Sequence, residues 1–257
     1  MSNISVIILT HNEEKNIREC IESALPLSGE ILILDDHSTD ETVKIALSLG
    51  AKVLNLPDNI NGFGEKRRYA TANARFDWVF HLDSDERIST ELANSINDSF
   101  GTLRQQDVVS VARLTFLFGK PVHHCGWYPD CKRRLYNRKH TNFSDALVHE
   151  DVTLNTDSHI IKLKGDLFHY SYPTLESLLR KQIFYAQLWG RDKAKKGRKT
   201  SLTTIPFRAL FFFLKTYIIR KGFLDGKIGL WLSIANMSYE CSKYLCLYAE
   251  QNKINKN

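Results

Sequence analysis

Short apolar runs alternate with amphipathic stretches through the first third of the chain. The runs are bounded by polar residues, which is typical of buried strands, and cover Ile4–Leu9, Glu30–Leu34, Lys52–Leu56 and Trp78–Leu82. Helical periodicity between them predicts helices over about 14–24, up to about 49 and over about 65–74. The first two helices follow sequences with helix-start chemistry, Thr10-His11-Asn12-Glu13 and Ser38-Thr39-Asp40-Glu41. This alternation predicts an α/β fold: a Rossmann-like, mostly parallel sheet flanked by helices, with right-handed crossovers.

The second half of the chain is less regular. Loose alternation predicts strands at Asp107–Phe118, Arg133–Asn137 and Ile160–Tyr170, of which the first two pair. From Thr174 onward the periodicity is helical, with helices expected over 176–189, 206–220 and 225–249. The sequence therefore predicts a C-terminal helical extension after the sheet.

Polar side chains follow three of the predicted parallel strands at the points where the strands end. They are Thr10, Asn12 and Glu13 after the first strand, Asp35 and Asp36 after the second, and Asp83 and Asp85 after the fourth. Because the carboxyl ends of such strands border the ligand crevice, we expect these side chains to meet in one cleft. Asp83 and Asp85 would then share one hard cation, Mg²⁺ or Mn²⁺, that also holds substrate phosphates. The alternative is a solvated acidic turn.

Two common nucleotide-binding motifs are missing from the sequence. No G-x-G-x-x-G follows the first strand, which argues against a dinucleotide-binding dehydrogenase, and no G-x-x-x-x-G-K-[ST] is present, which argues against a P-loop enzyme. The carboxylates are instead accompanied by Lys66, Arg67 and Arg68. Cationic side chains and a divalent metal together neutralise a pyrophosphate, so the set suits a nucleoside diphosphate.

Together these motifs resemble the signature of family 2 glycosyltransferases, which have the GT-A fold. The matching segments keep the family's order and spacing over the first third of the chain and are Thr10–Glu13, Asp35–Asp40, Lys66–Arg68 and Asp83–Asp85. The resemblance implies inverting transfer of a sugar from a nucleotide-sugar, helped by a divalent cation. The chain departs from many relatives at Arg68, where they have asparagine.

The resemblance also implies roles for individual residues. The positions that bind the donor nucleotide-sugar correspond to Thr10, Asn12, Glu13, Asp36, Lys66, Arg67 and Asp83. Asp83 and Asp85 match the DXD motif, whose last carboxylate binds the metal. A late histidine completes the metal site in several GT-A enzymes, and this position corresponds to His169.

Inverting transfer needs a base that takes the proton from the acceptor hydroxyl. A carboxylate in a partly dry pocket serves this purpose, because burial and neighbouring carboxylates raise its pKa. Glu150 is the first candidate and Asp151 the second. Their position downstream of the DXD motif resembles that of the catalytic base in family 2 enzymes. The alternative is a surface acidic pair beside a strand.

The segment His123–Cys131 contains two histidines and two cysteines, but its C-x5-C spacing fits no common structural zinc finger. An acceptor-side loop is the preferred interpretation. Trp127 and Tyr128 offer flat apolar faces for a sugar ring, and Asp130 offers a hydrogen-bonding carboxylate. Trp127 also fits a core position.

Three later segments resemble the bacterial enzymes that add a hexose, often β-glucose, to a heptose of the lipopolysaccharide inner core. They are Arg133–Tyr136, His149-Glu150 and Arg220–Gly226. This resemblance implies UDP-glucose as donor and a lipid-linked or phosphorylated glycan as acceptor. Alternative acceptors are a polyprenyl phosphate and another surface polysaccharide. A nucleotide-sugar-forming nucleotidyltransferase is the alternative of another class, but it would need a glycine-rich loop after the first strand.

The net charge of +6 favours anionic partners such as nucleic acid, a phosphorylated glycan or an anionic membrane face. A non-catalytic basic module would need no carboxylate constellation, so no nucleic-acid partner is expected. The basic run Arg191–Lys199 precedes a broad apolar helix at 206–220, a combination that suits an anionic membrane surface. Packing of the C-terminal helices on the catalytic domain is a compatible alternative.

Five scattered cysteines indicate a reducing compartment. The N-terminal apolar run is too short for a signal peptide, and no stretch offers about 18 uncharged apolar residues, so no spanning helix is expected. We therefore expect a cytoplasmic protein, peripheral on the inner membrane. A catalytic domain is expected over 1–200, with a donor half (1–100) and an acceptor half (101–200), followed by an amphipathic helical extension over 201–257.

Overall fold

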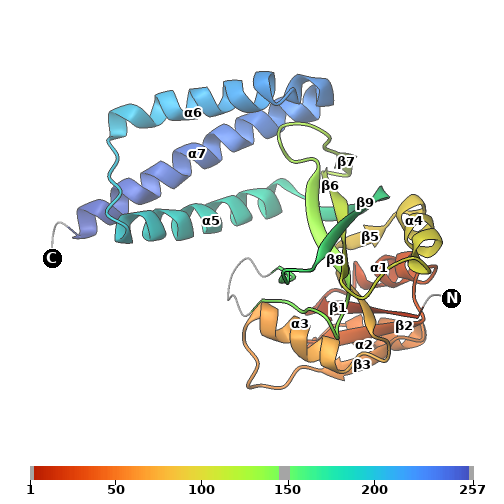
Figure 1. Ribbon diagram of the computed structural model, residues 1–257. Helices are drawn as coiled ribbons and strands as arrows, with labels where there is room; N and C mark the ends of the chain where they lie inside the picture. Colours follow the sequence, from red (N-terminus) through yellow and green to blue (C-terminus); the bar gives the residue numbers. More distant parts are fainter. Residues whose placement is uncertain (1–2, 145–150, 255–257) are drawn as a thin grey trace. The chain divides into compact units, whose positions relative to one another are not determined.

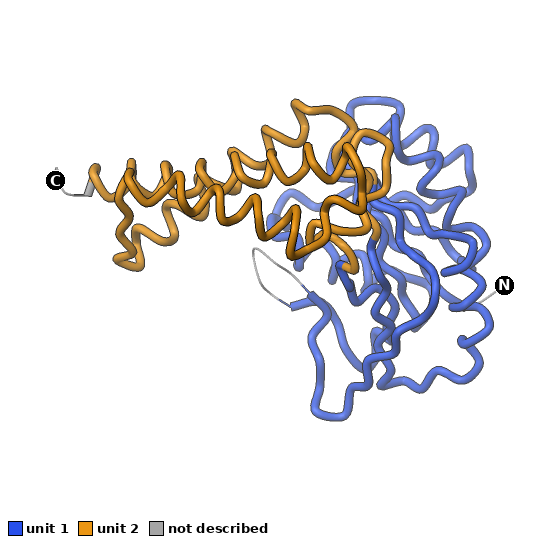
Figure 2. Tube along the Cα trace, turned by 90° about the horizontal axis from the view of Figure 1, so that it is seen from above, with its two compact units in different colours: residues 1–113, 130–169 blue, residues 114–129, 170–257 orange. Residues whose placement is uncertain are grey.

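The structure, a computed structural model, describes residues 3–144 and 151–254 (Figure 1). The chain divides into two compact units, which Figure 2 colours separately. Unit 1 contains Met1–Arg113 and Asp130–His169, and unit 2 contains Leu114–Pro129 and Tyr170–Asn257. The domain boundary expected near residue 200 falls within unit 2.

Unit 1 begins with four parallel strands. They are β1 (Ile4–Thr10), β2 (Glu30–Asp35), β3 (Lys52–Asn55) and β4 (Trp78–Asp83), in the order β3-β2-β1-β4. The connecting helices are α1 (Ile17–Ala24), α2 (Thr42–Ser48) and α3 (Phe63–Ala72). The predicted α/β fold and the parallel pairing of these strands are confirmed.

The strands after β4 extend the sheet in antiparallel fashion. They are β5 (Glu86–Ile88), β6 (Asp107–Leu117), β8 (Asp130–Asn137) and β9 (His159–Tyr172), with helix α4 (Thr90–Phe100) after β5. β8 pairs with both β4 and β6, and β5 pairs with β9, so that the complete sheet is mixed. The three strands predicted in this region are confirmed, whereas the hydrophobic pattern does not predict β5 or α4.

Both faces of the parallel strands are buried, because the side chains of β1 alternate between two apolar cores. Ile4, Val6 and Ile8 pack in one core with residues of α1 and α4. Ile7 packs in the other core with Ala70 of α3. Burial on both faces explains why β1 is a continuous apolar run rather than an alternating one.

Unit 2 is mainly helical. Its helices are α5 (Leu175–Lys195), α6 (Ile205–Leu214) and α7 (Gly226–Ile254), a π-helical turn Lys215–Ile219 continues α6, and the short strand β7 (Lys120–Pro121) pairs with β6. Helix α7 lies between α5 and α6 and packs against both (Figure 1). α5 approaches α7 so closely that a Cβ at Gly190 would lie 2.8 Å from Cβ of Cys246. The predicted C-terminal helical extension is confirmed, and α5 belongs to it because of this close packing.

The helix start predicted in the first loop is wrong in detail, whereas α2 begins at Thr42, directly after the predicted Ser38–Glu41. Thr10 ends β1, and its hydroxyl donates to Asp35 Oδ1 at 2.9 Å instead of capping a helix. α1 begins later, at Ile17. At α2, the side chain of Asp40 accepts a hydrogen bond from the backbone of Thr42 at 3.0 Å. Thr10 thus connects two strand ends instead of starting a helix.

One helical segment within the described ranges, Leu202–Ile219, is long and apolar enough to cross a membrane by length and composition alone. The expectation of no spanning helix rested on the lack of about 18 uncharged apolar residues, and Arg208 and Lys215 do interrupt this segment. Length and composition alone therefore do not overturn that expectation. Most of the segment is exposed in unit 2.

His81 lies fully buried in the middle of β4, where its imidazole stays neutral. Its Nε2 lies 2.9 Å from Thr71 Oγ1 and 3.2 Å from the hydroxyl of Tyr136. Burial, reinforced by the charges of Arg67 and Arg134, holds the pKa of His81 well below its usual value of 6.5. The folded protein therefore resists protonation at a position that the unfolded chain protonates in mild acid.

This difference predicts a loss of stability in acid. Below about pH 6.5 the unfolded state binds a proton at His81 that the folded state does not, so the free energy of unfolding falls by up to about 1.4 kcal/mol per pH unit. Urea unfolding of the wild type and of His81→Gln, compared between about pH 7 and pH 5, measures the contribution. The variant is expected to depend less steeply on pH. Equal slopes would show that His81 is protonated in the folded state as readily as in the unfolded chain.

Candidate functional site

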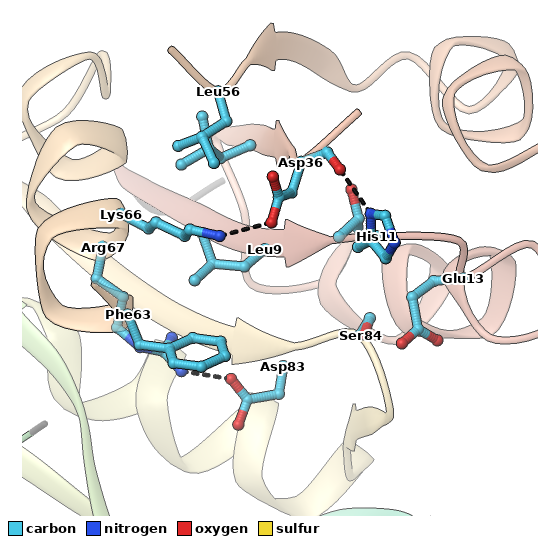
Figure 3. Close-up of a pocket in the computed structure, with 12 residues that line it drawn as sticks. Leu9, His11, Glu13, Asp36, Leu56, Phe63, Lys66, Arg67, Asp83 and Ser84 are labelled. Carbon is cyan, nitrogen blue, oxygen red and sulfur yellow. Dashed lines mark hydrogen bonds and ion pairs between the residues drawn. The ribbon is translucent and has the colours of Figure 1, made fainter. Parts of the chain in front are cut away.

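A pocket of about 240 Å³ lies in unit 1, at the carboxyl ends of β1, β2 and β4 and beside the start of α3 (Figure 3). It is lined by Leu9, Thr10, His11, Glu13, Leu34, Asp36, Leu56, Phe63, Lys66, Arg67, Asp83 and Ser84. The strand register explains this convergence, because Thr10 pairs with Asp35 of β2 and Leu9 pairs with Asp83 of β4. Of the strand-end side chains, Thr10, Glu13, Asp36 and Asp83 thus line one pocket together with Lys66 and Arg67. Asn12, Asp35 and Asp85, which were expected in the same cleft, do not line it.

Asp36 is the acidic side chain that the end of β2 presents to the pocket (Figure 3). Its Oδ2 lies 2.5 Å from Nζ of Lys66, and its carbonyl oxygen lies 2.6 Å from Nδ1 of His11. The preceding Asp35 is buried and accepts a hydrogen bond from the backbone of Ser38 at 2.8 Å. Successive side chains of a strand point to opposite faces, so one aspartate stabilises the loop while the other faces the pocket.

Asp83 is held between two arginines beside this pocket. Nη2 of Arg67 donates to Oδ1 at 2.6 Å, and Nη2 of Arg134 donates to Oδ2 at 2.8 Å. Burial alone would raise the pKa of Asp83, but Arg134 and Arg67 hold it well below its usual range. Asp83 is therefore an ionised carboxylate, and each of its two oxygens accepts a hydrogen bond from a different arginine.

Arg134 also holds Glu86, the residue that begins β5. Its Nη2 donates to Oε1 of Glu86 at 2.6 Å, and Oε2 of the fully buried Glu86 accepts from the backbone of Asp83 at 3.0 Å. Burial raises the pKa of Glu86, against the opposing charge of Arg134. Sequence reasoning placed neither Glu86 nor Arg134 at the site. The carboxylate at the end of the Asp83–Glu86 run was the available signal.

Asp85 and His169 are brought together by the pairing of β5 with β9. Glu86 lies opposite His169 in this ladder, and Oδ2 of Asp85 comes within 3.3 Å of Nε2 of His169. A carboxylate oxygen and an imidazole nitrogen are suitable ligands for Mn²⁺. Phosphate oxygens and water would supply the other ligands of such an ion. Over residues 3–144 and 151–254, no three His, Cys, Asp or Glu side chains are grouped as metal ligands.

Two of the expected nucleoside-binding residues contact neighbouring loops. The side chain of Glu13 accepts from Nδ2 of Asn16 at 2.7 Å. Asn12 has a left-handed backbone (φ 56°), which asparagine tolerates, and its Oδ1 accepts from the backbone of Thr39 at 2.8 Å. Asn12 therefore joins the loops that follow β1 and β2 and shapes the pocket wall from outside.

The expected catalytic base falls partly outside the described residues. Glu150 lies among residues 145–150 and is not described. Asp151 is about half exposed, and its Oδ2 lies 3.4 Å from Nη2 of Arg133. Asp151 thus remains a carboxylate with solvent access and a cationic neighbour.

The expected acceptor residues belong to different units. Asp130, in unit 1, binds Nη2 of Arg113 at 2.5 Å and Nζ of Lys132 at 3.0 Å. Trp127, in unit 2, packs against an apolar cluster, with its ring centroid 5.3 Å from that of Tyr172. This packing fits the alternative that Trp127 is a core residue.

Apolar side chains that sequence reasoning did not assign to the site form much of the pocket wall. Leu9, Leu34 and Leu56 come from the ends of the first three strands, and Phe63 starts α3. The ring of Phe63 is 58% exposed, with Nζ of Lys66 5.8 Å from its centroid. An exposed aromatic ring beside a cation suits a nucleobase attached to a phosphate.

A family model described as glycosyl transferase family 2 matches residues 5–151, which is more than half of the chain. This range contains the four parallel strands and every residue that lines the pocket. The chain belongs to glycosyl transferase family 2, as the sequence motifs predicted.

Individual relatives agree with this membership. An uncharacterized glycosyltransferase of Rickettsia typhi is 31% identical over 238 residues, which are 89% of this chain and 81% of that protein. The lipopolysaccharide core biosynthesis glycosyltransferase LpsC of Rhizobium meliloti is 24% identical over 88% of this chain and 87% of its own length. Among solved structures, TarS of S. aureus aligns with 98% of this chain and 55% of its own, at 18% identity and a TM-score of 0.47.

Proposed function

We propose that this protein is an inverting glycosyltransferase that moves a hexose, preferably glucose, from a UDP-linked donor to a glycan of the cell surface. The observation that carries the proposal is the pocket in which Asp36 meets Lys66, next to the arginine-held Asp83. Asp85, two residues after Asp83, lies 3.3 Å from Nε2 of His169. A nucleoside diphosphate matches this pocket, because the apolar wall suits its base and the ammonium group of Lys66 suits its phosphates.

In the proposed donor complex, Phe63 and the leucines of the wall contact the base, and Asp36 accepts a hydrogen bond from the nucleoside. Lys66 turns from Asp36 toward the phosphates. Asp85 and His169 would hold Mg²⁺ or Mn²⁺, which when bound supplies positive charge to the diphosphate leaving group. Asp83, kept ionised by its two arginines, accepts hydrogen bonds from hydroxyl groups of the donor sugar or ribose at the pocket edge.

The proposed reaction is a single displacement at the anomeric carbon. Glu150, or Asp151 in its place, takes the proton of the acceptor hydroxyl as the oxygen of that hydroxyl attacks. The bond from the anomeric carbon to the diphosphate breaks on the opposite face, so configuration inverts. Asp130 of unit 1 remains the proposed contact for the acceptor sugar, whereas Trp127 is packed in the apolar cluster of unit 2.

The proposed acceptor is the lipopolysaccharide core or a related lipid-linked glycan. LpsC, which resembles this chain over nearly its full length, carries a name from lipopolysaccharide core biosynthesis. The excess of basic over acidic residues suits an acceptor that bears phosphates. With a lipid-borne acceptor, we place the enzyme in the cytoplasm at the inner membrane.

The test is a panel of nucleotide-sugars screened by thermal shift, with and without Mn²⁺. A donor that binds only the folded state stabilises it by about 2.7 kcal/mol when present at about a hundredfold excess over its dissociation constant. We expect a metal-dependent rise in melting temperature with one UDP-sugar, followed by release of UDP when the acceptor is added. Absence of a response to every donor would contradict the proposal.

Lys66→Met tests the phosphate contact directly. Loss of the ammonium group is expected to weaken donor binding about ten- to a hundredfold, because a charge-assisted hydrogen bond contributes roughly 1.5–3 kcal/mol. Lys44→Met removes an exposed lysine of α2, which pairs with Glu41, and serves as the matched control. Isothermal titration with UDP measures both. Equal affinities for UDP in the two variants would remove Lys66 from the site.

A further inference from the structure

The outer face of α6 and its π-helical continuation is rich in exposed apolar side chains. Its side chains follow helical spacing and have exposed fractions of 76% for Phe207, 54% for Leu210, 60% for Phe211, 42% for Leu214, 55% for Ile218 and 68% for Ile219. Phe223, Leu224 and Trp231, which follow this segment along the chain, are exposed as well. An apolar patch of this kind on a soluble domain marks an interaction site.

The inner face of the same helix is already used. Ile205, Ala209 and Thr216 are buried, and α6 packs along α7 (Figure 1). Arg208, the charge that interrupts α6 in sequence, folds back so that its guanidinium carbon lies 4.8 Å from the ring centroid of Tyr244. Its Nη1 also donates to the hydroxyl of Tyr244 at 3.4 Å. Arg208 is still exposed, so its charge lies at the flank of the apolar side chains.

The surroundings of this face are strongly basic. Between Arg198 and Tyr239 the sequence has one acidic residue, Asp225. That carboxylate is only 5% exposed and binds His124 through Nδ1 at 2.7 Å and through its backbone nitrogen at 2.8 Å. The same stretch has seven basic residues, Arg198, Lys199, Arg208, Lys215, Arg220, Lys221 and Lys227. The segment thus presents apolar and positive groups with almost no exposed negative charge.

We infer that the outer face of α6 inserts into the headgroup region of an anionic membrane, with the helix lying in the membrane plane. The apolar side chains enter the acyl boundary, and the flanking lysines and arginines contact lipid phosphates. The inference stands on unit 2 alone. Its consequence, that a lipid-borne acceptor is met at this surface, rests on the proposed function.

Two other arrangements fit the observations less well. A second copy of the chain on this face would bring the basic residues that flank it close to those of the copy across a twofold axis. A bilayer-spanning α6 would have to separate from α7 or carry it into the lipid, and α7 bears Glu240, Lys243 and Glu250. α7 does not qualify as a span among the described helices. An in-plane helix requires neither change.

The experiment is sedimentation of the full-length protein with phosphatidylcholine vesicles, with and without phosphatidylglycerol. We expect binding to the anionic vesicles that weakens as salt is raised, and little binding to the neutral ones. Phe207→Ser combined with Phe211→Ser is expected to weaken binding at least about tenfold, because both rings lose their contact with the acyl chains. The matched control is Leu25→Ser combined with Leu47→Ser, at exposed positions in unit 1, and should bind as the wild type does.

Each other result overturns the inference. Equal vesicle binding by the wild type and the phenylalanine variant would place the contact elsewhere. A wild type that is dimeric and does not bind vesicles, together with a monomeric phenylalanine variant, would assign the face to a second copy. Resistance to alkaline extraction would indicate a spanning helix. The thermal response to nucleotide-sugar is measured on every variant, and its loss in the wild type would instead refute the proposed function.

Discussion

Asp85→Asn is expected to lower the rate of sugar transfer by about two to three orders of magnitude, because the neutral amide is a poor ligand for Mg²⁺ or Mn²⁺. Asp85 and His169 are the two groups that approach each other at 3.3 Å beside the pocket. The metal-dependent part of the thermal shift with nucleotide-sugar should disappear in the same variant. Release of UDP in a coupled assay measures the rate.

Asp98→Asn, on the exposed side of α4, is the control for the same chemical change and should retain wild-type transfer. His169→Gln is expected to shift the metal dependence to higher Mn²⁺ concentrations, since it removes one of the two proposed ligands. Full activity of Asp85→Asn at ordinary Mn²⁺ concentrations would separate Asp85 from the metal and leave the DXD resemblance without its main function.

Arg134→Met is expected to destabilise the protein by about 3 kcal/mol, which is large compared with ordinary substitutions. Arg134 is 6% exposed and binds both Asp83 and Glu86. Its removal leaves the buried Glu86 and the partly exposed Asp83 with less compensation, although Arg67 and Arg113 remain near them. The free energy of unfolding in urea measures the effect.

Arg180→Met is the matched control, because it breaks an arginine–glutamate pair on the exposed face of α5. An exposed i,i+4 pair contributes at most about 0.5 kcal/mol. Adding Glu86→Gln to Arg134→Met should recover part of the lost stability, since one buried charge is then gone. A loss of under about 1 kcal/mol for Arg134→Met alone would mean that the network relaxes around the missing cation.

The parallel half of the fold could be predicted from the sequence because each strand is a compact apolar run. Ile4–Leu9 and Trp78–Leu82 were placed to within a residue of β1 and β4. β5 was not predictable, because three residues, Glu86–Ile88, carry no period, and α4 begins directly after it. The first helix was placed too early, since the hydroxyl of Thr10 serves the neighbouring strand rather than a helix start.

The candidate site was predictable where side chains follow strand ends. Asp36 and Asp83 reach the pocket because parallel strands end together, a consequence of topology that sequence order already contains. Phe63 and Arg134 were not predictable in the same way. Phe63 follows a loop with no periodicity, and Arg134 comes from an antiparallel strand whose partner could be known only from the register of β8 with β4.

All the side chains that line the pocket come from one continuous stretch, Leu9 to Ser84. The groups proposed for the acceptor and for lipid contact lie downstream of it. On the proposed function, the residues that select the nucleotide and those that select the glycan thus lie in separate parts of the sequence. Exchange of the later part is then expected to redirect the enzyme to a new glycan, provided that Arg134 and His169, which contact Asp83 and Asp85, are retained.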